Sequence, residues 1–213
     1  AAQSWENVAG GRRVWIGWLN NWQYARDVPV FGARGFMTIP RDLSIRRTRD
    51  GLRLVQRPSR ELTALRQGGI TPDWVGGGTP GEQSVPSDVM EIEATVAAAA
   101  RDTCGLRLRT SLGEETLIGY DAAAGCAFVD RQRSGRPITG GRHSIRLPVP
   151  NGPLKMHLFI DHTSVEAFFG DGAAVISCQI YPEEPISGAA WFSESGASRA
   201  ASATIYPFAN IDG

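Results

Sequence analysis

Residues 154–169 read LKMHLFIDHTSVEAFF, and this stretch decides the fold class. Leu154, Met156, Leu158 and Ile160 fall on every second position of its first half. Side chains of a β-strand point alternately to opposite faces, so a period of two indicates a strand that is buried on one face. Residues 161–164 (DHTS) are turn formers, with Asp161 placed to cap backbone amides. The stretch therefore predicts two neighbouring antiparallel strands, 154–160 and 164–169.

The same period of two recurs along the chain, at residues 14–19, 90–96 and 104–109. Further strands are expected at 35–40, 43–48, 52–57, 115–120, 126–131, 143–148, 173–181, 188–193 and 200–206. Turn formers such as Ser134–Gly135 and Gly170–Asp171–Gly172 lie between them. Many short strands separated by turns favour an all-β fold, here an antiparallel β-sandwich or barrel.

One segment departs from this period. Residues 58–66 read PSRELTALR, with Ser59 as a candidate N-cap and with Leu62 and Leu65 on one helical face. Gly68–Gly69 would end the helix, and residues 67–87 hold six glycines and three prolines, as expected of loops with one short strand near 73–76. The sequence predicts three parts, listed in order: residues 1–57, a linker helix over 58–69, and a β-sandwich over 70–213.

Composition narrows the class of partner. The 213 residues include 22 Lys or Arg and 22 Asp or Glu, a balanced charge that predicts no attraction to nucleic acid or to anionic membranes. A chain of this length with 42% hydrophobic residues is sufficient for a buried core. No apolar run approaches the roughly 20 residues that span a bilayer, and we expect no membrane partner.

Three cysteines, Cys104, Cys126 and Cys178, lie in apolar segments with strand-like patterns. None is part of a Cys-x-x-Cys pair or lies near a group of histidines, so we expect no zinc site, and nothing in the sequence indicates another metal or a cofactor. Two readings of the cysteines remain open: three buried free thiols, or one disulfide between Cys104 and Cys126.

Several longer motifs occur in a fixed order. They are RVWIGWLNNWQYA (13–25), GFMTIPRDLS (35–44), FVDRQRSG (128–135) and LFIDHTSVEAFFGDG (158–172). Together they resemble glycoside hydrolase family 32, and the resemblance covers essentially all 213 residues. Within the family, it is to microbial levanases, exo-inulinases and β-fructosidases. It implies that residues 1–57 are the last strands of a five-bladed β-propeller and that an antiparallel β-sandwich follows.

The resemblance also implies retaining hydrolysis of β-fructosyl linkages in sucrose, inulin or levan, and secretion to the cell exterior or periplasm. Retaining enzymes use two carboxylates, a nucleophile and an acid/base. The family carries its catalytic carboxylates in the motifs WMNDPNG, RDP and EC, and none of the three occurs in this sequence. No residue therefore inherits a catalytic role, and the chain is predicted to be incompetent by itself.

In the family, a tryptophan of this blade walls the fructose site, because aromatic rings stack on the apolar faces of sugars. Trp18 and Trp22 are the candidates for substrate binding, with a slight preference for Trp22, whereas Trp15 is expected to pack within the blade. Residue 1 falls where the family would have the inside of a strand. This position suggests a truncated product, a cleavage product or one piece of a split enzyme, whose expected partner is the N-terminal propeller.

Other polar groups are expected to be structural. Asp161, His162 and Glu166 look like a catalytic trio, but a turn and a strand explain them, with Glu166 pairing with Arg131 or a similar cation. No G-x-S-x-G motif is present for a nucleophilic serine. Glu91 and Glu93 are expected on a solvated strand face.

Two alternative functions remain open. A sandwich can bind fructan through exposed aromatic side chains, for which Trp74 and Trp191 are the candidates. Alternatively, residues 1–57 without a propeller would expose apolar surface and a strand edge, which predicts assembly into a homo-oligomer.

Overall fold

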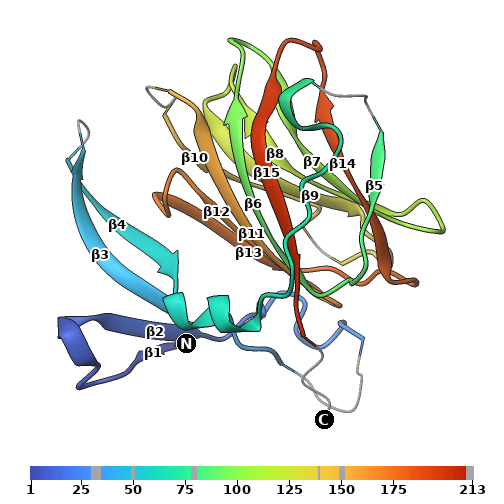
Figure 1. Ribbon diagram of the computed structural model, residues 1–213. Coiled ribbons are helices and arrows are strands. Elements are labelled where there is room, and N and C mark those ends of the chain that lie inside the picture. Colours follow the sequence, from blue (N-terminus) through green and yellow to red (C-terminus); the bar gives the residue numbers. More distant parts are fainter. Residues whose placement is uncertain (30–34, 49–50, 78–80, 139, 149–151, 210–213) are drawn as a thin grey trace.

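A computed structural model describes residues 1–29, 35–48, 51–77, 81–138, 140–148 and 152–209. In these residues the strands form three antiparallel sheets, and the helical segments are short 3-10 turns (Figure 1). The first sheet lies to one side, and the other two stack face to face. The expected all-β class is confirmed.

The first sheet, called the N-terminal sheet below, has four strands in sequence order. They are β1 (Ala2–Ser4), β2 (Arg13–Gly17), β3 (Arg41–Thr48) and β4 (Gly51–Pro58). β3 and β4 pair along their whole length, from Arg41 opposite Pro58 to Thr48 opposite Gly51. This sheet is too small to enclose a core of its own, so its buried side chains depend on contacts with the rest of the molecule.

The other two sheets form the sandwich. The six-stranded sheet has the order β10-β9-β8-β7-β14-β5, and the five-stranded sheet has the order β13-β12-β11-β6-β15. The bounds are β5 Glu82–Ser84, β6 Met90–Ala97, β7 Thr103–Thr110, β8 Glu115–Asp121, β9 Cys126–Arg133, β10 Arg142–Arg146, β11 Leu154–Asp161, β12 Ser164–Phe169, β13 Ala174–Gln179, β14 Ile186–Ser193 and β15 Arg199–Pro207.

One hydrophobic core lies between these two sheets. Its members come from both inner faces and include Met90, Ile92, Leu106, Ile118, Val129, Leu158, Val165, Phe169 and Ile205. The predicted hairpin is present as β11 and β12, with Met156 opposite Phe169 and Ile160 opposite Val165. In its turn, the His162 amide donates to Asp161 Oδ1 at 2.8 Å, as expected of a turn aspartate.

Two expected strands differ in the structure. Residues 35–40 form an isolated bridge between Met37 and Trp18, and the regular strand β3 begins only at Arg41. Residues near 73–76 are not a strand, because Gly76 and Gly77 adopt φ values of 71° and 86° in a 3-10 turn.

The linker segment is a 3-10 helix, Arg60–Leu65, and the Ser59 side chain makes no capping hydrogen bond. A helix of six residues is too short for propagation to stabilise α geometry, and 3-10 turns serve as connectors of this length. Ser59 is buried against the N-terminal sheet instead, with its amide donating to the Pro40 carbonyl at 2.9 Å.

All three cysteines lie among the described residues and are free thiols. β8 lies between β7 and β9, so Cys104 and Cys126 are two strand spacings apart, about 9–10 Å, which exceeds the reach of a disulfide. The alternative of a Cys104–Cys126 bond is therefore wrong. Cys104 and Cys178 are buried as expected, but Cys126 is half-buried, and burial raises the pKa of Cys178 to about 12. No helix among the described residues is long and apolar enough to cross a bilayer.

Candidate functional site

Trp18 and Trp22, called the aromatic pair below, lie directly after β2. Their ring centroids are 4.9 Å apart with planes tilted by 55°. The intervening asparagines build the turn: the Asn21 amide donates to Asn20 Oδ1 at 2.8 Å, and the Gln23 amide donates to Asn21 Oδ1 at 2.9 Å. The bond from Gln23 to Asn21 is typical of an Asx turn, in which the side chain accepts from the amide two residues on. Trp22 is 87% exposed, so its ring is available to a ligand.

A pocket of about 390 Å³ lies beside Trp18, between the N-terminal sheet and the sandwich. Its walls include Trp15, Trp18, Asn20, Tyr24, Thr38, Arg41 and Ser177. Trp15 has a buried indole Nε1 that finds no hydrogen-bond partner among the described residues. The lining therefore combines aromatic faces with amide, hydroxyl and guanidinium groups. These side chains can stack on and hydrogen-bond a sugar, but none of the described lining residues is a carboxylate that could act as nucleophile or acid.

Glu166 is fully committed to other protein groups. It pairs with Arg41 of β3, which replaces the expected partner Arg131, and its Oε1 accepts the Ile39 amide at 2.6 Å. Arg131 instead donates to the carbonyls of Gly140 and Gln179 at 2.8 and 2.7 Å. The expected pairing of Glu166 with a cation is confirmed, but the cation is Arg41, which arrives from the N-terminal sheet, and not Arg131.

The apparent trio of Asp161, His162 and Glu166 does not act together. The His162 ring Nδ1 lies 2.6 Å from Asp88 Oδ2, and Asp161 bonds the His162 backbone. Glu166 and His162 thus have separate partners. The structural reading of these residues is supported by the geometry.

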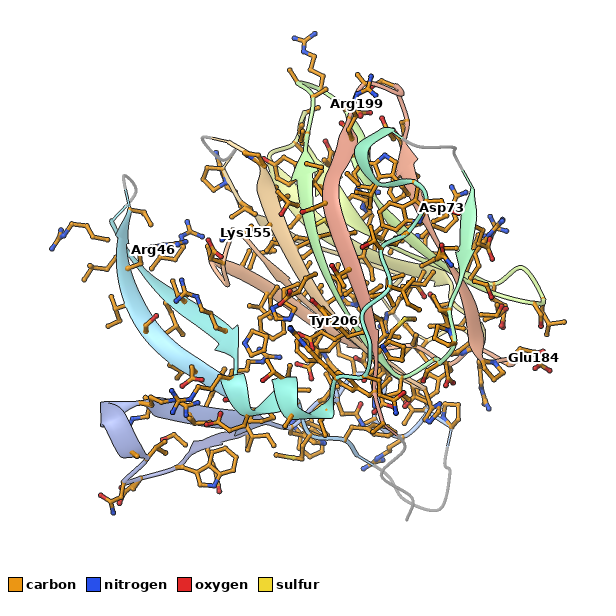
Figure 2. All side chains as sticks on the ribbon, viewed as in Figure 1. Arg46, Asp73, Lys155, Glu184, Arg199 and Tyr206 are labelled. Carbon is orange, nitrogen blue, oxygen red and sulfur yellow. The ribbon has the colours of Figure 1, made fainter. Side chains whose placement is uncertain are left out.

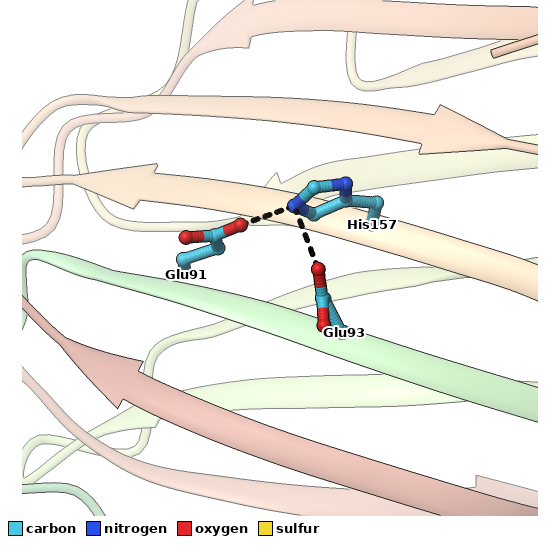
Figure 3. Close-up of side chains that lie close together, drawn as sticks. All are labelled: Glu91, Glu93 and His157. Carbon is cyan, nitrogen blue, oxygen red and sulfur yellow. Dashed lines mark hydrogen bonds and ion pairs between the residues drawn. The ribbon is translucent and has the colours of Figure 1, made fainter. Parts of the chain in front are cut away.

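Glu91, Glu93 and His157 approach one another on β6 and β11, as Figure 3 shows. Arg66 completes this ion cluster: its Nε donates to Glu91 Oε2 at 2.7 Å, and its Nη2 lies 2.6 Å from Glu93 Oε1. His157 Nε2 bonds Glu91 Oε1 and lies 3.8 Å from Glu93. The expectation of a solvated face is wrong for Glu91, which is 1% exposed.

Burial alone would raise the pKa of Glu91, but hydrogen bonds from Arg66 and His157 lower it. The same hydrogen bond to Glu91 raises the pKa of Arg66. Within the described residues, this is the group of His and acidic side chains that has the spacing of a metal site. A cation there would compete with the Arg66 guanidinium for the same carboxylate oxygens, so the cluster is better suited to hold the linker on the sandwich. Arg66 comes from a distant segment, and no periodicity in the sequence indicates that contact.

Trp74 is not an exposed platform for sugar, because it is buried in the sandwich core. Its Nε1 donates to the Ala189 carbonyl at 3.3 Å, and its ring stacks on Trp191 at 6.5 Å between centroids. Trp191 is half-buried by this contact. Trp74 therefore has no exposed ring face for a lectin-like sugar site, and Trp191 has only part of one.

Two family models match the chain in order. The model of the glycosyl hydrolases family 32 N-terminal domain matches residues 1–58, and the model of the family 32 C-terminal region matches residues 61–207. The chain belongs to glycoside hydrolase family 32. The sequence resemblance is thereby confirmed, and the N-terminal sheet corresponds to the match with the family's N-terminal domain.

Curated relatives within family 32 include levanases. A levanase of Bacillus subtilis (strain 168) is 34% identical over 227 residues, covering 100% of this chain and 33% of the levanase. A levanase of Bacillus sp. (strain L7) is 33% identical and covers 99% of this chain but 24% of its own length. The chain thus spans about a quarter to a third of these relatives.

Solved structures of family 32 enzymes share the fold. The exo-inulinase of Aspergillus awamori superposes with a TM-score of 0.84 at 26% identity, covering 98% of this chain and 42% of the inulinase. The fructan 1-exohydrolase IIa of Cichorium intybus superposes with a TM-score of 0.78 at 16% identity, which shows the fold alone. The fold of this chain, a small sheet beside a sandwich, therefore superposes on part of each of these two structures.

Proposed function

We propose that this chain is the C-terminal part of a secreted, retaining β-fructosidase that hydrolyses β-fructosyl linkages in fructans such as levan or inulin. In this proposal the chain has no hydrolytic activity by itself. It contributes the last blade of the propeller, the aromatic pair that faces the fructosyl unit, and the supporting sandwich. The missing carboxylates belong to the remainder of the propeller.

Two observations together support this proposal most strongly. The two family 32 models match the chain in order, and the exposed indole of Trp22 lies where the resemblance expects a tryptophan of the last blade. The family 32 N-terminal model reaches only residues 1–58 of this chain, and the family's three carboxylate motifs are absent from the sequence. Trp22 nevertheless presents an open ring beside Trp18. Relatives named levanase and extracellular exo-inulinase support the substrate class and secretion.

A chimera tests this proposal. The part of the Bacillus subtilis levanase that precedes its aligned region is joined to residue 1 of this chain, and fructose release from levan is measured. We expect the chimera to release fructose and the 213-residue chain alone to release none. Release by the chain alone would contradict its incompetence, and a folded but inactive chimera would contradict the assignment.

The aromatic pair is tested in the same chimera. Trp22→Ala is expected to remove a stacking contact of about 1 kcal/mol and to raise KM about fivefold. Trp5→Ala is the matched control, because Trp5 is also an exposed tryptophan of the N-terminal sheet region, at 48%. Equal KM values for the two variants would remove Trp22 from the sugar site.

A further inference from the structure

Residues 36–38 hold the start of the aromatic turn in place. The Leu19 amide donates to the Phe36 carbonyl and the Thr38 amide to the Gly17 carbonyl, both at 2.8 Å. Thr38 Oγ1 also accepts a hydrogen bond from the Gly17 amide at 2.9 Å, and Met37 forms an isolated antiparallel β-bridge with Trp18. The position of Trp18 is therefore set by the position of the 36–38 segment.

That segment is fixed by a carboxylate of the sandwich. Glu166 on β12 accepts the Ile39 amide through Oε1 at 2.6 Å and pairs with the Arg41 guanidinium through Oε2. Ser177 on β13 donates to Glu166 Oε2 at 3.1 Å and accepts from Arg41 Nη2 at 2.5 Å. Glu166 and Arg41 are 3% and 5% exposed. Both Glu166 oxygens have partners, whereas Arg41 Nε is buried without a hydrogen-bond partner among the described residues. A buried ion pair with several hydrogen bonds to one carboxylate has a narrow range of geometries, so it defines where residues 39 and 41 lie.

The far end of the turn is held by the sandwich as well. Tyr24 and Val28 are buried in a small cluster with Tyr181 of the sandwich. The Arg131 guanidinium lies over the Tyr24 ring, 5.2 Å from its centroid. The aromatic pair thus lies between two attachments to the sandwich, while the Trp22 ring itself extends into solvent.

We propose that Glu166 is a positioning residue for the aromatic pair, through which the sandwich sets the geometry of the wall that receives a fructosyl unit. The proposal rests on the proposed function for the identity of that ligand. Stacking on an exposed ring gives more affinity when little conformational freedom is lost on binding, so a turn that is held before binding increases affinity. This gives Glu166 a role in recognition without contact to the sugar.

The first test needs no sugar. In the full 213-residue chain, indole 1H–15N resonances are recorded and assigned with single Trp→Phe variants. Glu166→Gln is expected to shift or broaden the Trp18 and Trp22 signals and to speed hydrogen exchange at the Ile39 amide at least tenfold. The signals of Trp74 and Trp191, in the sandwich, are expected to stay unchanged. Unchanged Trp18 and Trp22 signals would overturn the proposal, as would equal changes at all four tryptophans.

Two further variants keep this test decisive. Glu115→Gln neutralises another largely buried sandwich carboxylate, which pairs with Arg133 and Arg107, and should leave the aromatic pair unchanged. Ser177→Ala removes only the hydroxyl that bonds both Glu166 and Arg41. It should produce smaller changes at the Trp18 and Trp22 signals. If Glu166→Gln does not fold, Ser177→Ala provides the test of the positioning role.

A fructo-oligosaccharide titration separates this proposal from the proposed function. We expect Glu166→Gln to weaken binding about fivefold relative to the parent chain, with the Glu115→Gln variant unaffected. If the parent chain binds no fructo-oligosaccharide, the sugar-binding role fails, yet the sugar-free spectra still decide whether Glu166 positions the pair. Parent binding with no loss in Glu166→Gln would overturn the positioning role alone.

Discussion

At the scale of single residues, the surroundings decide what a side chain does. Trp22 and Trp74 are the same residue type in loop-rich segments, but one is 87% and the other 3% exposed. Glu91 and Glu166 both sit on strands beside alternating apolar residues, and each is buried with an arginine from outside its own sheet. A buried carboxylate is tolerated only when a cation or several hydrogen-bond donors compensate for the loss of water. Each of these arginines lies far away in sequence, so strand patterning gave no indication of the contact.

Asp102 shows the same rule with neutral partners. It is 1% exposed, and its carboxylate accepts hydrogen bonds from the Ser193 and Ser198 hydroxyls and from the Ser195 amide at 2.9 Å. Burial by itself would raise the pKa of Asp102, but these hydrogen bonds more than offset burial and lower it well below its usual range. The charged form therefore holds the loop between β14 and β15.

This depressed pKa predicts a pH dependence. A carboxylate with a lowered folded-state pKa stabilises the fold above its unfolded pKa of about 3.9, and this contribution is lost as pH falls below that value. Urea unfolding at pH 7 and pH 3 should show a smaller loss of stability for Asp102→Asn than for the parent chain. Equal pH profiles for parent and Asp102→Asn would contradict the assigned role.

At the scale of elements, the turn between β12 and β13 joins the sandwich to the N-terminal sheet. Gly170, Asp171 and Gly172 all have positive φ, at 60°, 57° and 82°. The Gly172 carbonyl accepts the Gln56 amide of β4 at 3.0 Å. A Cβ on Gly172 would lie 2.0 Å from the Gln56 carbonyl oxygen. Glycine is therefore required here both by conformation and by the close approach of β4.

Gly172→Ala is expected to destabilise the chain by more than its φ alone requires. Gly152→Ala is the matched control, because Gly152 also has a positive φ, 118°, but a Cβ there would meet no atom within 4 Å. The control should lose roughly 1–2 kcal/mol from left-handed backbone strain, and Gly172→Ala should lose at least about 2 kcal/mol more. Denaturant unfolding measures both. Similar losses of stability in the two variants would show that β4 moves away from the added Cβ at residue 172 without a cost in free energy.

At the scale of the whole molecule, polar contacts join the N-terminal sheet to the sandwich. Besides Glu166 with Arg41, the Arg46 guanidinium donates to the Gly170 carbonyl at 3.2 Å. Figure 2 shows Arg46 on the hairpin of β3 and β4, which extends beside the strands of the sandwich. Three apolar side chains of this hairpin remain exposed: Ile45 at 72%, Leu52 at 67% and Leu54 at 49%. Such a patch favours association with another apolar surface.

The homo-oligomer expected from the sequence stays a prediction, and we expect the contact between its copies at this apolar patch. Ile45 and Leu54 are paired across the strands. A double variant, Ile45→Glu with Leu54→Lys, keeps a favourable cross-strand pair while removing the apolar surface. Light scattering should show concentration-dependent association of the parent chain and a monomeric double variant.

Leu112→Glu is the control for this experiment, since Leu112 is 61% exposed but lies on a sandwich turn. It should associate like the parent chain. A parent chain that stays monomeric at all concentrations would contradict the prediction.

The sequence by itself determined the all-β class, most of the strands and the family. Alternating apolar positions such as Leu154 to Ile160 depend on neighbours two residues away, and the motifs are contiguous, so both are readable locally. Only the tertiary structure decided which charged residues are buried, which tryptophans are exposed and that the three cysteines stay free thiols. These depend on contacts between segments distant in sequence, such as Arg41 with Glu166 and Arg66 with Glu91. A strand pattern gives the buried face of a strand, but the partner that arrives on that face is set by the path of the chain in space.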